Sequence, residues 1–312
     1  MSFVDGVKKF FGVKSPEEKE KAKLRTPQEK AKDFFGALLF AAVAALLIKT
    51  FLLESSRIPT GSMEGTILVG DFVLVNKVIY GSCSPRTIPF TSVELPYFCF
   101  PAVRDPKPKE IVVFEYPGDR DQLKPTEIVN YVKRCIGVPG DTVQIINKVI
   151  FVNGKEFFRP PKIQYINPQT IPAGLADPRI FPKGSPWNKD NYGPVVCPKK
   201  GDEIELTPST VEKWRTIIDR EYGKRVVTVE NGVVKIEGKA VKTYKLQDDY
   251  YLMIGDNRDD SLDSRFWGFV PRRKIVGRAE IVYWSWDPSY SFAEIFKLLG
   301  SVRLERIAKI LN

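Results

Sequence analysis

The 312 residues of this sequence include no histidine. A Ser-His-Asp triad, a Cys-His pair and an H-E-x-x-H zinc site are therefore excluded within the chain. The sequence also lacks an S-x-x-K box, a Walker A loop, a C-x-x-C pair and a G-x-G-x-x-G turn after a strand. Any nucleophilic catalysis must then use a lysine or a carboxylate as its base. We expect neither a metal ion nor another cofactor.

Long hydrophobic runs are also scarce, and the clearest one extends from Phe34 to Leu53 behind a lysine-rich leader. At about 1.5 Å per residue this run spans roughly 30 Å, the thickness of a hydrocarbon core. We expect a basic cytoplasmic leader over 1–33 and one transmembrane helix over 34–53, with the following chain on the outer side. A cleaved signal peptide is the alternative, but the run is long for one and no clear A-x-A site follows.

The formal net charge is +10, and lysines are frequent in the leader. Such a charge is compatible with nucleic acid, with a membrane surface or with solubility alone. Because the cations precede a membrane span, we expect them to set its orientation beside the membrane lipids. We expect no nucleic-acid partner.

Cysteine is rare as well, with Cys83, Cys99, Cys135 and Cys197. All four follow the span, so an oxidising compartment would permit disulfides. Three full pairings are possible, and the sequence does not choose among them. A bond from Cys83 to Cys99 would close a short loop and is our first expectation, whereas Cys135 is expected to be a buried free thiol within a strand.

Beyond the span the sequence is mainly β. Short apolar runs at 72–75, 111–114, 250–254 and 279–284 are bounded by turn-forming residues. Asn153-Gly154 and Asn231-Gly232 are dipeptides favoured in two-residue hairpin turns. Frequent hairpins favour an antiparallel β-sheet or barrel over a βαβ fold. We expect one β domain over 54–155 and 245–290 and a smaller inserted subdomain over 156–244.

The last residues, 291–312, carry apolar side chains at helical spacing. This pattern predicts an amphipathic C-terminal helix. Three locations remain open for it: the membrane interface, the surface of a partner, or the surface of its own domain.

Ser62 is a candidate nucleophile, because Pro59 stiffens the preceding turn and Gly61 lets the backbone approach closely. The Ser62 N–H and the Thr60 hydroxyl could donate to the oxyanion of an attacked carbonyl. An ordinary turn would have the same composition. A serine hydroxyl also needs a base before it is nucleophilic.

Lys133 lies in an apolar, strand-like run and is the candidate base. Burial disfavours the charged amine, and it can lower a lysine pKa by about 3–5 units. Strand alternation places Tyr131 and Lys133 on one face and Arg134 on the other. The alternative is a solvent-exposed Lys-Arg pair on an edge strand.

A third segment, from Gly255 to Val270, is dense in charged and turn-forming residues. Its spacing does not match an EF-hand loop. Ser261 could donate a hydrogen bond to a neutral lysine amine and orient it, and Asp263 could pair with Arg265 to brace a site. A charged hairpin loop is the alternative.

Together these segments resemble the boxes of bacterial type I signal peptidases, in the same order. The matching stretches are 58–63, 131–134 with 137–141, and 255–258 through 269–271. The resemblance implies that Ser62 is the nucleophile, Lys133 the general base and Ser261 its orienting residue. It also implies that Asp263 and Arg265 form a structural pair. Thr60 replaces the family's usual serine, and Gly65 replaces its usual proline.

The expected protein is a membrane-anchored serine endopeptidase that removes signal peptides from exported preproteins at the outer face of the bacterial cytoplasmic membrane. Ile58 and Val132 are expected to wall shallow pockets for small side chains, and the secretion translocon is a candidate partner. One alternative is a specialised relative that matures a single conjugation or pilus substrate. Another is an inactive anchored β domain that binds partners through 156–244. A self-cleaving Ser-Lys repressor is disfavoured, because a membrane span stands where its DNA-binding domain would be.

Overall fold

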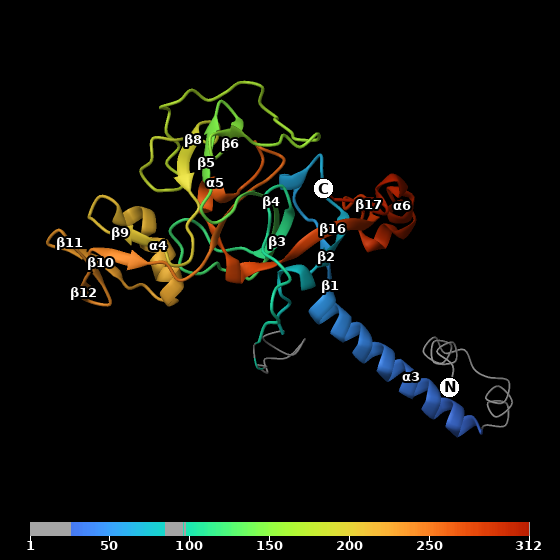
Figure 1. Cartoon of the computed structure of the whole chain (residues 1–312). Coiled ribbons are helices and arrows are strands. Elements are labelled where there is room, and N and C mark those ends of the chain that lie inside the picture. Colours follow the sequence, from blue (N-terminus) through green and yellow to red (C-terminus); the bar gives the residue numbers. More distant parts are fainter. Residues whose placement is uncertain (1–25, 85–95, 97, 312) are drawn as a thin grey trace. The chain divides into compact units, whose positions relative to one another are not determined.

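The computed structural model describes residues 26–84, 96 and 98–311. They form two compact units that divide between Lys49 and Thr50. The unit before this division contains most of one long helix, and the β-structure lies in the unit after it. Figure 1 shows the elements of each unit along the chain. Most of the predicted leader, residues 1–25, lies outside the described residues.

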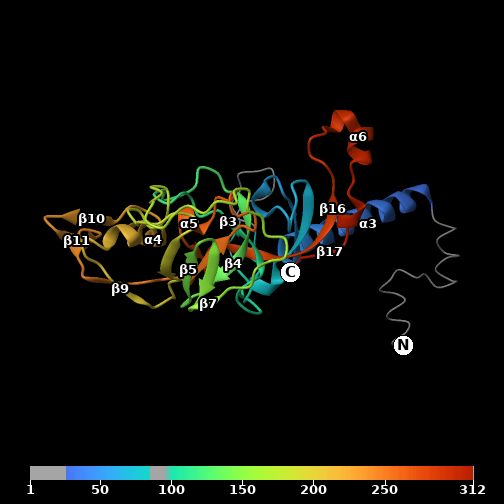
Figure 2. The ribbon, with the colours of Figure 1, turned by 90° about the horizontal axis from the view of Figure 1, so that it is seen from above.

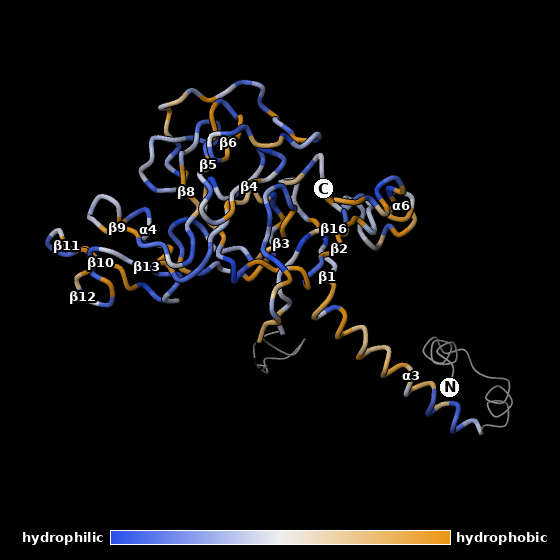
Figure 3. Tube along the Cα trace, in the orientation of Figure 1, coloured by the Kyte–Doolittle hydropathy of each residue, from blue (hydrophilic) through white to orange (hydrophobic). Residues whose placement is uncertain are grey.

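Helix α3 comprises Pro27–Leu47 and continues as a π-helical turn over Ile48–Leu52. Together they are long and apolar enough to cross a membrane. Figure 3 shows hydrophobic colouring along α3 beyond its hydrophilic first turns. The helix begins before the predicted position 34, because Thr26 and Glu29 form a reciprocal capping box around Pro27. Hydropathy alone does not register such a cap. Within the described residues, this one N-terminal helix has the length and hydropathy of a membrane anchor.

The largest sheet of the second unit is antiparallel throughout. Its strand order is β1-β2-β16-β3-β4-β14-β15, and β17 pairs with β16. The predicted antiparallel β fold is therefore confirmed. The strands are β1 (Leu53–Arg57), β2 (Asp71–Asn76), β3 (Ile111–Glu115), β4 (Asn130–Gly137), β14 (Tyr250–Ile254), β15 (Val270–Pro271), β16 (Ile275–Ser285) and β17 (Lys309–Ile310).

Both faces of this sheet are buried at β3. Ile111 and Val113 pack in one hydrophobic cluster, and the alternate residues Val112 and Phe114 pack in another. Because successive side chains of a strand point to opposite faces, the sheet has a core on each side. The cluster of Ile111 and Val113 also contains Met63, which immediately follows Ser62 in the chain.

The remaining strands form smaller sheets. A four-stranded sheet has the order β7-β6-β5-β8, with β5 (Thr142–Ile146), β6 (Val149–Val152), β7 (Lys155–Glu156) and β8 (Tyr192–Val196). β9 (Glu203–Glu205) pairs with β13 (Thr243–Lys245), and β10 (Val227–Glu230), β11 (Val233–Ile236) and β12 (Lys239–Ala240) form a third group. Both predicted Asn-Gly turns are present with positive φ at each position.

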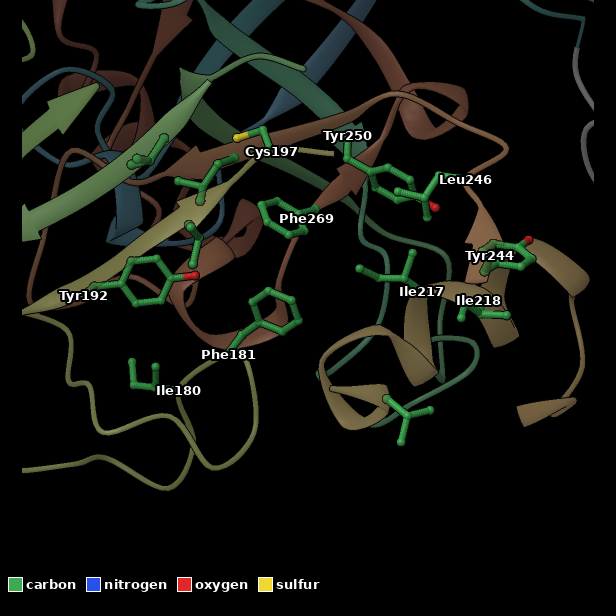
Figure 4. Packing of buried hydrophobic residues seen from close by; sticks show 14 of the residues in the cluster. Ile180, Phe181, Tyr192, Cys197, Ile217, Ile218, Tyr244, Leu246, Tyr250 and Phe269 are labelled. Carbon is green, nitrogen blue, oxygen red and sulfur yellow. The ribbon is translucent and has the colours of Figure 1, made fainter. Parts of the chain in front are cut away.

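The domain boundary predicted at residue 155 does not coincide with a sheet boundary. Strands β5 and β6, which we placed with the main sheet, pair instead with β8 from the predicted insertion. A hairpin pattern identifies two neighbouring strands, but it does not identify the sheet that they join. One core cluster joins the smaller sheet to the main one, since Tyr192 of β8 and Tyr250 of β14 both belong to it (Figure 4).

Three α-helices of the second unit are described, namely α4 (Val211–Tyr222), α5 (Ser264–Trp267) and α6 (Ile295–Gly300). Short 3-10 turns occupy 61–63, 78–80, 272–274, 292–294 and 304–306. Figures 1 and 2 agree that α4 with β10–β12 and α6 lie at opposite ends of this unit.

The predicted C-terminal helix over 291–312 is wrong. The helical part is confined to α6 and two flanking 3-10 turns, and the chain then returns as β17 beside β16. Arg306 is buried in an ion pair with Asp71 of β2. The pairing of β17 with β16 and the Asp71–Arg306 ion pair stabilise this return of the chain. These long-range contacts override the local helical propensity of residues 291–312.

The Asp71–Arg306 pair predicts a large effect on stability. Arg306→Met leaves the buried Asp71 carboxylate without its cation, so the free energy of unfolding should fall by about 3–5 kcal/mol. Denaturant titration of the full chain in detergent measures this loss. Lys297→Met is the control, because the exposed Lys297–Glu294 pair should contribute less than about 1 kcal/mol. Equal losses in both variants would contradict the prediction.

The disulfide expectation is confirmed, because Cys83 and Cys99 are bonded. Cys135 and Cys197 are buried free thiols, as expected for Cys135. The rings of Phe98 and Phe100, on either side of Cys99, pack against Phe51 with centroids 6.1 and 5.5 Å away. The bridge therefore holds an aromatic cluster close to the start of the β unit.

Candidate active site

Ser62 stands on a short 3-10 turn, Gly61–Met63, that follows β1. The chain before the turn is held by two backbone hydrogen bonds, from Ile58 N to Asp71 O at 2.9 Å and from Gly70 N to Ile58 O at 3.0 Å. The last side chain of the turn, Met63, is buried in the core. The turn is therefore fixed on both sides, while Ser62 itself is half-buried at the surface.

Lys133 reaches this serine from β4, where it lies opposite Val112 of β3. Its Nζ donates to Ser62 Oγ at 2.6 Å and to the Val132 carbonyl oxygen at 3.1 Å. Only 3% of Lys133 is exposed to solvent. The structure thus brings the predicted nucleophile and the predicted base into direct contact.

The surroundings of Lys133 lower the pKa of its amine. Burial lowers the pKa of this amine to about 8, although the charge of Asp263 acts in the opposite direction. The Tyr131 ring, whose centroid is 5.2 Å from Nζ, favours the cation as well. Desolvation prevails over both, and the neutral amine that a base requires is accessible near neutral pH.

Asn257 clamps the serine turn from the loop after β14. Its backbone N–H donates to Ser62 O at 3.1 Å, and its Nδ2 donates to Gly61 O at 3.1 Å. No role for Asn257 was predicted from the sequence. Its position inside the Gly255–Arg258 box was the available signal, but a side-chain contact to a turn far away in sequence cannot be inferred from composition.

Ser261 does not make the predicted hydrogen bond to Lys133. Its Oγ is buried and acts on the Asp263 carboxylate, whose pKa it helps to lower. Lys133 Nζ is directed instead to Ser62 and to the backbone of Val132. Ser261 packs against Gly255, on which an added Cβ would lie 2.3 Å from Ser261 Oγ and 2.4 Å from Ser62 O. Its contributions in this structure are packing beside the serine turn and a polar contact to Asp263.

Asp263 and Arg265 form a buried, bidentate ion pair, with both N–O distances at 2.8 Å. Arg265 Nη2 also donates to the Arg258 carbonyl oxygen at 2.8 Å, and Asp263 accepts from Gly255 N at 3.2 Å. Burial acts to raise the pKa of Asp263, but the Arg265 guanidinium holds the net pKa below its ordinary value. The pair braces the loop that supports the serine turn.

A second buried ion pair, Arg134–Asp256, was missed by sequence reasoning. Arg134 Nε and Nη2 donate to the Asp256 carboxylate at 2.8 and 2.6 Å, and Thr66 Oγ1 donates to it at 2.7 Å. We had considered Arg134 only as the neighbour of Lys133 on the opposite strand face. Through Asp256, this pair connects β4, which carries Lys133, to the loop after β14 and to Thr66 near the serine turn. It therefore helps to hold Lys133 and Ser62 in place.

A cavity of about 660 Å³ opens over Ser62 and Lys133. Ile58 and Val132 both line it. Thr60 also lines the cavity and is exposed, so its hydroxyl is accessible to a bound ligand. The remaining lining residues are Ser56, Arg57, Pro59, Gly61, Met63, Val129, Asn130, Tyr131, Asp260 and Leu262. Across the described ranges, no three His, Cys, Asp or Glu side chains are grouped to hold a metal ion.

The crowding at Gly255 predicts that even one methyl group disturbs the site. Gly255→Ala should cost about 1–3 kcal/mol of stability, since the Cβ contacts both Ser261 and the Ser62 backbone. We also expect kcat to fall, because the nucleophile is displaced from its base. Denaturant titration and peptidase assays measure the two effects. Gly300→Ala is the control, because its Cβ would have no atom within 4 Å; unchanged kcat in Gly255→Ala would refute the prediction.

Comparisons with known proteins agree with this geometry. The chain matches the family described as "Signal peptidase, peptidase S26" over residues 31–284. Signal peptidase I of Pseudomonas aeruginosa is 30% identical over 289 residues, covering 88% of this chain and 78% of that protein. Signal peptidase I of Rickettsia massiliae is 30% identical over 294 residues, covering 89% of this chain and 92% of that protein.

A solved signal peptidase I from Enterococcus faecalis aligns with 57% of this chain and 98% of its own at 18% identity. Its TM-score of 0.26 is too low to define a common fold. The sequence matches carry the assignment, because the family match extends over most of the chain and includes both Ser62 and Lys133. This chain belongs to the signal peptidase family, peptidase S26.

Proposed function

We propose that this serine peptidase removes signal peptides from exported preproteins, with Ser62 as nucleophile and Lys133 as general base. The observation that carries the proposal is the 2.6 Å hydrogen bond between Ser62 Oγ and Lys133 Nζ. The lowered pKa of Lys133 supports its role as base, and the relatives named signal peptidase I support the substrate class.

In this mechanism neutral Lys133 accepts the Ser62 hydroxyl proton as Oγ attacks the scissile carbonyl carbon. The Ser62 N–H and the Thr60 hydroxyl donate to the oxyanion that forms. The oxyanion collapses, the peptide C–N bond breaks, and the Lys133 ammonium protonates the leaving amine. Neutral Lys133 next takes a proton from water, which attacks the acyl-enzyme. The product carboxylate leaves, and the proton returns to Ser62 Oγ.

Substrate would bind as an extended segment along the start of β4. Strand β14 pairs with β4 only from Arg134 onward, so in the described structure the edge of Asn130–Lys133 on that side has no strand partner. Backbone hydrogen bonds to such an edge hold a peptide in register, and pockets beneath it select alternate side chains. Ile58 and Val132 leave room for small residues, such as alanine, beside the scissile bond.

The orientation in the membrane is also part of the proposal. The cations before α3 favour a cytoplasmic N-terminus and a catalytic domain on the outer face of the bacterial cytoplasmic membrane. The Cys83–Cys99 disulfide is consistent with an oxidising compartment. Lipids would surround the apolar length of α3. The secretion translocon would deliver preproteins to the site.

Processing of a purified preprotein tests this function directly. The full chain in detergent should release the signal peptide, and mass spectrometry of the product should place the cut after a small residue. Ser62→Ala is expected to leave the preprotein intact while retaining the wild-type circular dichroism spectrum. An intact preprotein with the wild type would contradict general signal-peptide removal. It would then favour an enzyme for one substrate or an inactive binding domain.

A further inference from the structure

A second cavity, of about 380 Å³, shares no lining residue with the cavity over Ser62. It lies between the hairpin of β5 and β6, the segment 156–168 and the loop after β14. The lining residues are Asn147, Lys148, Val149, Ile150, Glu156, Arg159, Ile163, Tyr165, Asn167, Pro168 and Arg258. Ligand-binding pockets usually have volumes of about 300–1,000 Å³, so this cavity has room for a small molecule.

Arg258 is the unusual member of this lining. Only 4% of it is exposed, its Nε makes no hydrogen bond, and no described carboxylate forms an ion pair with it. The other buried arginines near the active site, Arg134 and Arg265, each have a bidentate carboxylate partner. Burial lowers the pKa of Arg258 to about 10, so the guanidinium still carries its charge at neutral pH. The charges of Asp256 and Asp263 favour the Arg258 cation, but each of these carboxylates is already paired with another arginine. A buried charge without an ion-pair partner of its own is costly.

The neighbouring charges leave the cavity positive. Arg159 is exposed and has no ion-pair partner in the part of the chain that the structure describes. The Arg159 guanidinium lies 5.7 Å from the centroid of the Tyr165 ring, and Lys148 Nζ lies 5.2 Å from it. Lys148 is itself near the carboxylates of Asp190 and Asp259, at 3.8 and 4.0 Å. Arg258 and Arg159 are therefore the cations left to attract a ligand, and exposed Glu156 opposes them in part.

We propose that this cavity binds a small oxyanion, a carboxylate or a phosphate, through the guanidinium of Arg258, with Arg159 closing its mouth. The planar fork of an arginine matches two oxygens of either group. Val149, Ile150 and Ile163 supply an apolar wall, which fits a ligand whose oxyanion is attached to a hydrocarbon body. Neither arginine takes part in the peptidase mechanism, so the site is separate from the proposed function.

Titration calorimetry of the full chain in detergent tests the site without measuring peptidase activity. Sodium benzoate and inorganic phosphate are the probes, each compared with chloride at the same ionic strength. We expect saturable binding of at least one probe. Arg159→Gln should weaken it about tenfold by removing a charge-assisted contact. Arg258→Gln should abolish binding, and Arg225→Gln, an exposed arginine outside the lining, should leave it unchanged.

The relative affinities identify the ligand chemistry. Tighter binding of benzoate indicates an organic carboxylate, and tighter binding of phosphate indicates a phosphoryl group; either result supports the site. The proposal is overturned if neither probe binds saturably to the wild type, or if Arg159→Gln binds as tightly as the wild type. Because Arg159 is exposed, this variant decides the question even if Arg258→Gln does not fold.

Discussion

Replacing Lys133 with alanine is expected to lower kcat/KM for preprotein cleavage by about 10²–10⁴-fold, the usual contribution of a general base. Its Nζ is the base within hydrogen-bond reach of Ser62 Oγ in the described structure, and the chain has no histidine to substitute for it. The oxyanion donors and the binding cavity would remain, so a residual rate should persist. Initial rates of signal-peptide release measure the effect.

A second variant separates chemistry from folding. Lys133→Met keeps the buried hydrocarbon stem and removes the amine, so it should be as inactive as alanine while preserving stability better. Lys213→Met is the matched control, because Lys213 is partly buried beside Trp214 in α4 and lines no part of the Ser62 cavity. More than a tenth of wild-type activity in Lys133→Met would rule out Lys133 as the base.

The pH profile of the peptidase should be steep on its acid side. Lys133 must be neutral to accept a proton, and burial lowers its pKa to about 8. Below that pH the neutral fraction falls about tenfold per unit, so kcat/KM at pH 6 should be roughly 10²-fold below its plateau. Above pH 8 the amine is already neutral, and the rise should level off. Initial rates between pH 5 and 10, at constant ionic strength, test this shape.

The variant Asp263→Asn should change the pH at which kcat/KM rises. The charge of Asp263 raises the pKa of Lys133, so its removal should move the rising limb to lower pH. If the substitution only loosened the loop after β14, the plateau value of kcat/KM would fall but the pH of the rise would not change. A wild-type rate that is independent of pH from 5 to 8 would show that Lys133 does not limit the reaction.

Local patterns were sufficient for much of this protein. The missing histidine restricted the base to lysine or a carboxylate. The turn around Ser62 and the apolar run around Lys133 made both residues candidates, and their pairing followed from the resemblance to type I signal peptidases. The Asn-Gly turns and the strands at 72–75, 111–114 and 250–254 were also found, because hairpin chemistry and alternation act over a few residues. The apolar helix followed from length and hydropathy alone.

Long-range packing decided the rest. The sequence did not indicate that Ser261 would pack beside Gly255 without reaching Lys133, nor that Asn257 would clamp Ser62. The Arg134–Asp256 pair and the strand return after α6 likewise depend on segments far apart in the chain. Composition and periodicity determine which residues can be buried, paired or reactive. Only the tertiary structure decides which partner each one meets, because that choice depends on the register and packing of the whole sheet.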